Sequence, residues 1–237
     1  MWLAALLLIP GVLLLLPTRS VDGLPAQAPA ARASAPLANR APYGLLIAIG
    51  LIMALRFGGR GTVTTFFNVY LDEGLGTSTV LIGALSAIAQ LLSVPAALAA
   101  PLLITRWGHT RPIFWGTLGM ALCTLPLALI PHWAAAGLGF ISSGVLFSVT
   151  IGPIRIFSQE LVTPDWRATM ASAFMMGAGL AFSGMSLLGG YAIASLGYRP
   201  LFLIGTVLAI AGALLFWLCF RVPRGELVRK SLPESGE

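Results

Sequence analysis

Two arginines lie inside a stretch of the sequence that is otherwise apolar. The segment LRFGGRGTVTTFFNVYL, residues 55 to 71, places Arg56 and Arg60 four residues apart, so in a helix they share one face. An arginine at the centre of a bilayer costs roughly 2.5 to 3.5 kcal/mol even on the gentler insertion scale, so both side chains should face a watery cavity or a partner. Such a pair suits an anionic or polar ligand.

Further polar and aromatic side chains continue this face. We predict a substrate cavity lined by residues of this segment and of the next apolar run: Arg56, Arg60, Thr64, Phe67, Tyr70 and Gln90. Asn68 lies to one side of the face. A structural alternative stays open, because the apolar segment from 43 to 70 is longer than a membrane needs and can tilt. The head of Arg60 would then reach water at the outer surface.

The composition identifies the surroundings of these arginines as a membrane. Of 237 residues, 57% are hydrophobic and only 9% are charged, and the mean hydropathy is +0.91, whereas an ordinary soluble domain has about 25% charged residues. The net charge of +6 indicates loops that face an anionic leaflet rather than nucleic acid. The fold class is therefore all-α integral membrane.

The two cysteines, Cys123 and Cys219, lie in apolar runs without zinc or disulfide spacing. We expect no metal and no cofactor.

Apolar runs of about 20 residues predict about seven transmembrane helices. Their ranges are 2–16, 43–70, 79–104, 112–130, 133–154, 168–194 and 200–220. The domain organisation that follows is a helix at 1–17, a flexible Ala- and Pro-rich linker at 18–42, a six-helix bundle at 43–221 and a tail at 222–237. In the sixth run, Ala173, Gly177 and Ala181 recur every four residues and predict close packing against another helix.

Positive charges predict the orientation of the chain. Lys and Arg in short loops are retained in the cytoplasm, and here they gather in the linker, in the loops near 106–111 and 155–167, and in the tail, whereas Arg199 stands alone on the opposite side. This places the linker and the C-terminus in the cytoplasm and the N-terminus outside, in a multi-pass protein of the cell membrane. The alternative that residues 1–16 are a signal peptide lacks the basic n-region and contradicts this charge pattern.

The predicted arrangement is one helix, a cytoplasmic linker and six further helices. It matches part of a twelve-helix transporter, namely the last helix of the first half, the connecting loop and the whole second half. Motifs support this interpretation. The loop PLLITRWGHTRP resembles a degenerate copy of the short cytoplasmic motif G-x-L-a-D-R-x-G-r-R, in which Arg106, Gly108 and Arg111 are retained. Thr105 takes the position of the aspartate, which removes support for a charge relay in this gating loop. The stretches QELVTPDWRATMASAF and LLGGYAIASLGYRPLFLIG add to the resemblance.

On these stretches the chain resembles the C-terminal portion of a major facilitator superfamily transporter. The resemblance implies secondary transport of a small solute by alternating access, with efflux of small organic compounds as the default. The expected partners are the lipid bilayer, a small-molecule substrate, and either a missing N-terminal half or a second copy of the chain.

Two other classes were compared with a transporter. An enzyme would need a catalytic constellation, and the sequence contains no H-E-x-x-H, no G-x-S-x-G and no acidic residue inside an apolar run. A non-transporting membrane scaffold or a self-dimerising half-transporter stays open as an alternative, although two copies would each carry a surplus seventh helix.

Overall fold

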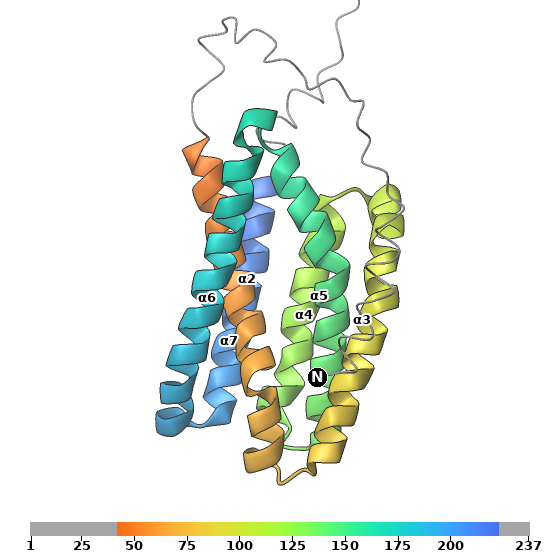
Figure 1. Cartoon of the computed structure of the whole chain (residues 1–237), viewed down its shortest axis with the longest axis vertical. Coiled ribbons are helices and arrows are strands. Elements are labelled where there is room, and N and C mark those ends of the chain that lie inside the picture. The colour runs from red at the N-terminus through yellow and green to blue at the C-terminus, as the bar shows by residue number, and fades with distance from the viewer. Residues whose placement is uncertain (1–41, 223–237) are drawn as a thin grey trace, which may run out of the picture. The chain divides into compact units, whose positions relative to one another are not determined.

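Six long helices make up the part of the chain that the computed structural model describes, residues 42–222 (Figure 1). They are α2 (Tyr43–Val69), α3 (Thr79–Trp107), α4 (Thr110–Leu129), α5 (Trp133–Glu160), α6 (Arg167–Leu196) and α7 (Tyr198–Phe220). All six are long and apolar enough to cross a membrane, which confirms the all-helical membrane class. The predicted helix at 1–17, nearly all of the linker and all but the first residue of the tail lie outside the described residues.

The helices begin close to their predicted starts, and several run further than predicted. α3 continues to Trp107 and α5 to Glu160, because the helical backbone extends past the apolar runs into polar residues that hydropathy does not mark. α2 passes directly into a π-helical turn over Tyr70–Gly74. The connections are short, and Gly108 and Gly197 reach φ values of 73° and 84° at the ends of α3 and α6.

The packing order of the helices has an internal symmetry. α2 packs along α6 and α7, α5 packs along α3 and α4, and α4 packs along α7; Figure 1 shows α2, α6 and α7 on one side of the bundle and α3, α4 and α5 on the other. If α2, α3 and α4 are exchanged with α5, α6 and α7, respectively, the same set of packed helix pairs results. Because successive helices alternate in direction, the two triplets are inverted repeats, an arrangement that many transporters share.

Small residues allow α2 and α6 to approach closely. A methyl group added at Gly177 of α6 would lie 2.9 Å from the carbonyl carbon of Gly50 in α2 and closer still to its oxygen. On the same row, the backbone oxygen of Ala173 faces Gly50 and the side chain of Ala181 faces Gly58. The small-residue row of α6 therefore lies against α2, where van der Waals packing rather than hydrophobic burial holds membrane helices together.

The outward faces of α3 and α6 are apolar and exposed. They carry Leu91, Val94, Leu98 and Leu102 on α3, and Met176, Leu180, Leu187 and Leu188 on α6. Such faces suit lipid or another apolar protein surface.

Candidate functional site

Arg56 of α2 is fully enclosed by protein, with an exposed fraction of 0%. Its Nη2 donates a hydrogen bond to Oγ1 of Thr150 in α5, and its Cζ lies 5.4 Å from the ring centroid of Phe147 in the same helix. Its Nε and Nη1 have no hydrogen-bond partner among the described residues. The cation is thus buried in the bundle with two donor nitrogens unused.

Arg60 follows one turn later on α2 and is half-buried. Its Nη1 donates to Oγ of Ser143 at 2.9 Å, and its Cζ lies 5.5 Å from the ring centroid of Phe140 and 5.6 Å from that of Phe147. The backbones of α2 and α5 approach each other far less closely than those of the packed pairs. The two helices are therefore joined by long side chains, the two arginines together with the stacked rings of Phe67 and Phe140, rather than by close backbone packing.

The α5 side chains that receive the arginines share one face of that helix. Phe140, Ser143, Phe147 and Thr150 follow at spacings of three and four residues, which places them in one row. Each hydroxyl donates to its own helix, Ser143 to the Phe140 carbonyl at 2.9 Å and Thr150 to the Leu146 carbonyl at 2.9 Å. Their lone pairs are left to accept from arginine, so the helix orients two acceptors toward α2.

Helix α3 borders the same site. A methyl group added at Gly144 of α5 would lie 3.3 Å from Nη2 of Arg60 and 3.8 Å from Oγ of Ser93 in α3, so the guanidinium fits between the three helices because residue 144 lacks a side chain. Gln90 belongs to the Ser93 row by its spacing and is exposed. Helix α3 thus presents Ser93 beside Arg60, with the exposed Gln90 one turn earlier on the helix.

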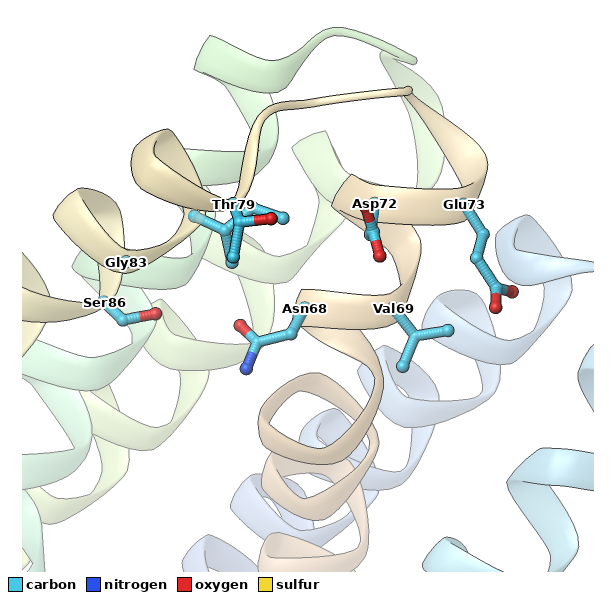
Figure 2. A pocket seen from close by; sticks show the side chains of 8 residues that line it. Asn68, Val69, Asp72, Glu73, Thr79, Gly83 and Ser86 are labelled. Atoms are coloured by element: carbon cyan, nitrogen blue, oxygen red, sulfur yellow. The ribbon is translucent and has the colours of Figure 1, made fainter.

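A pocket of about 460 Å³ opens where α2 ends and α3 begins (Figure 2). Figure 2 shows the Asn68 amide extending from α2 toward Ser86 of α3, with Asp72 in the π-helical turn that follows α2. The pocket is lined by Asn68, Val69, Asp72, Glu73, Thr79, Ile82, Gly83 and Ser86. Arg60, Thr64 and Asn68 are spaced by four residues on α2, and Asn68 lies about 80° around the helix from Arg60 at about 100° per residue. The pocket therefore lies two turns beyond Arg60 and to one side of its face.

Of the further aromatic and hydroxyl residues predicted beside the arginines, Phe67 lies at the site, Thr64 bonds to the backbone of its own helix, and Tyr70, in the π-helical turn, lies apart. Thr64 donates to the Arg60 carbonyl at 3.0 Å, and Phe67 stacks on Phe140 with centroids 3.8 Å apart. Tyr70 packs instead on Tyr198 and Phe202 of α7, each 5.2 Å away. At about 100° per residue, Phe67 lies about 20° from Arg60 around the helix and Tyr70 about 80°, which explains the difference.

Sequence reasoning missed Ser143, Phe140 and Phe147, although it included Gln90. The signal available was the spacing of polar and aromatic residues along α5, which matches a helical face. The loop residues Arg106, Gly108 and Arg111 lie at the turn between α3 and α4, where both arginines are exposed. They have no contact with this site. Among residues 42–222 no group of three or more His, Cys, Asp or Glu side chains is arranged to hold a metal.

Comparison with known proteins gives one match. The family model described as Major Facilitator Superfamily matches residues 1–185, and its members are transporters, not enzymes. No curated protein and no solved structure matches the chain. The matched range covers most of the sequence and α2 to α5 in full, together with much of α6. A family model of this extent and six apolar helices show that this chain belongs to the Major Facilitator Superfamily.

Proposed function

We propose that this bundle carries a small organic solute out of the cell by alternating access, and that the solute binds along the face formed by α2, α3 and α5. The observation that supports the proposal is the arginine site, in which Arg56 is fully buried and Arg60 is partly exposed. Arg60, Asn68 and Gln90 are polar and all partly or fully exposed, and such groups do not face lipid in the hydrocarbon region. They suit the wall of a water-filled path.

A second protein surface is needed to complete that path. A polar face between membrane helices has to be covered, and the exposed apolar sides of α3 and α6 flank the bundle. The proposed functional unit therefore holds a second helical bundle, either on the same polypeptide or in a second copy of the chain. Rocking of the two bundles about a midplane site would expose the arginines alternately to each side.

The proposed orientation puts the turn at Gly108 in the cytoplasm and the pocket at Asp72 outside, as the positive charges indicate. We expect a cysteine placed at Asp72 to react with a membrane-impermeant maleimide in intact cells, and a cysteine at Arg106 to react only after the cells are opened. The native Cys123 and Cys219 are changed to alanine first. The opposite labelling pattern would contradict the orientation.

Arg56→Gln tests the proposed site. For any compound that the wild-type protein moves, we expect the initial rate in membrane vesicles to fall at least about tenfold, since one buried charged hydrogen-bonding partner contributes on the order of 1.5 to 3 kcal/mol. A panel of radiolabelled organic acids, amines and neutral compounds is measured in everted and right-side-out vesicles, which also gives the direction of transport.

Arg167→Gln serves as the matched control, because Arg167 is an exposed arginine at the start of α6. An unchanged rate in Arg56→Gln, at equal amounts of protein in the membrane, would remove Arg56 from the site. If the wild-type protein moves no compound in either vesicle type, the proposed function itself is wrong.

A further inference from the structure

We propose that the site between α2 and α5 binds the oxyanion group of an aromatic acid, with the acid group between Arg56 and Arg60 and the ring against Phe140 and Phe147. This inference rests on the proposed function and specifies its substrate class. It is carried by the charge, the unused donors and the aromatic rings of the site.

The charge of the site calls for an anion. In the described part of the chain the acidic residues are Asp72, Glu73, Glu160 and Asp165, and all of them lie at or beyond helix ends. Asp72 is about 18 Å from Arg60 along the helix at about 1.5 Å per residue. Ser143 and Thr150 offer the arginines neutral oxygens. Within residues 42–222 no carboxylate neutralises this pair, and a bound anion would supply the missing negative charge.

The unused donors of Arg56 call for oxygen acceptors. Nε and Nη1 are buried and have no hydrogen-bond partner among residues 42–222. They point to different sides of the planar guanidinium, so each can donate to a separate oxygen of an oxyanion. Arg60 lies one turn away and is half-buried. It is the first cation that a ligand would meet, and Arg56 is the deeper one.

The rings of the site suit an aromatic body on the ligand. The ring centroid of Phe147 lies 5.4 Å from Cζ of Arg56 and 5.6 Å from Cζ of Arg60. The quadrupole of this one ring therefore partly stabilises both positive charges. Phe140 is stacked on Phe67 and also faces Arg60. Phe147 is itself half-buried, so part of its surface is open to contact with the ring of a ligand that binds beside the two arginines.

Three matched probes test the proposal on the purified full-length chain in lipid nanodiscs: benzoate, benzamide and benzylamine. They share one ring and differ in charge. We expect benzoate to raise the melting temperature by about 3 °C at ten times its dissociation constant, and benzamide and benzylamine to bind at least tenfold more weakly. Arg60→Gln should weaken benzoate binding at least tenfold, and the control Arg167→Gln should leave it unchanged.

The outcomes separate this inference from the proposed function. Equal binding of all three probes by the wild-type chain, or tighter binding of benzylamine, overturns the anion site even when Arg60→Gln fails to fold. Vesicle transport of amines or neutral compounds alone would overturn it too, while the chain would remain a transporter. Selective binding of benzoate that Arg60→Gln abolishes supports the site, and it would do so even if no vesicle experiment detected transport.

Discussion

Gly177→Ala should lower the melting temperature of the purified protein by roughly 6 to 12 °C. The added methyl group would meet the backbone of Gly50, 2.9 Å from its carbonyl carbon and 3.0 Å from its Cα, and backbone atoms cannot turn aside as a side chain can. Helices α2 and α6 would have to separate over their closest contact. Overpacking of this kind costs about 3 kcal/mol, and each kcal/mol shifts the melting temperature by roughly 2 to 4 °C in a chain of this size.

Gly179→Ala is the matched control on the same helix. A methyl group there has no atom within 4 Å, and alanine favours the helix over glycine by up to about 1 kcal/mol. We expect this variant to melt at or slightly above the wild-type temperature. If both variants melt together, the contact between Gly177 and Gly50 does not set the spacing of α2 and α6.

Arg56→Met should raise the melting temperature by roughly 4 to 8 °C and abolish transport. Burial of an arginine without a negative partner costs about 2 kcal/mol or more at membrane depth, and an apolar side chain of similar length removes that cost. Thr150 is not left unsatisfied by the change, because its hydroxyl still donates to the Leu146 carbonyl. Gain of stability with loss of activity is typical of a residue retained for function.

A lower melting temperature in Arg56→Met would mean that its bond to Thr150 holds the bundle together. Thr150→Val separates the two cases further, since it removes the acceptor and leaves the buried cation. We expect this variant to be less stable than the wild type, and the double variant Arg56→Met, Thr150→Val to resemble Arg56→Met alone. A double-mutant cycle of this kind isolates the energy of the pair.

The six described spans were predictable from hydropathy because a helix in lipid has to satisfy its backbone groups within itself. Apolar length therefore marks each crossing, and the structure differs from the prediction mainly at the ends of α3 and α5. The shared face of Arg56, Arg60 and Phe67 was also predictable, since it depends only on the helical period. Tyr70 shows the limit, because ten residues from Arg60 the face has already turned toward α7.

Composition, hydropathy and motifs were enough to predict a multi-pass helical membrane chain of a transporter family with two cations inside its second predicted span. The helix that contacts those cations became known from the packing of the helices. Ser143 and Thr150 follow their arginine partners by 83 and 94 residues. Membrane helices gain little from hydrophobic burial against one another, so hydropathy carries no information about which helices are neighbours. The shapes of the helices decide which ones pack together. Contacts such as that of Gly177 with Gly50 hold α2 against α6, and the arginines of α2 then contact α5.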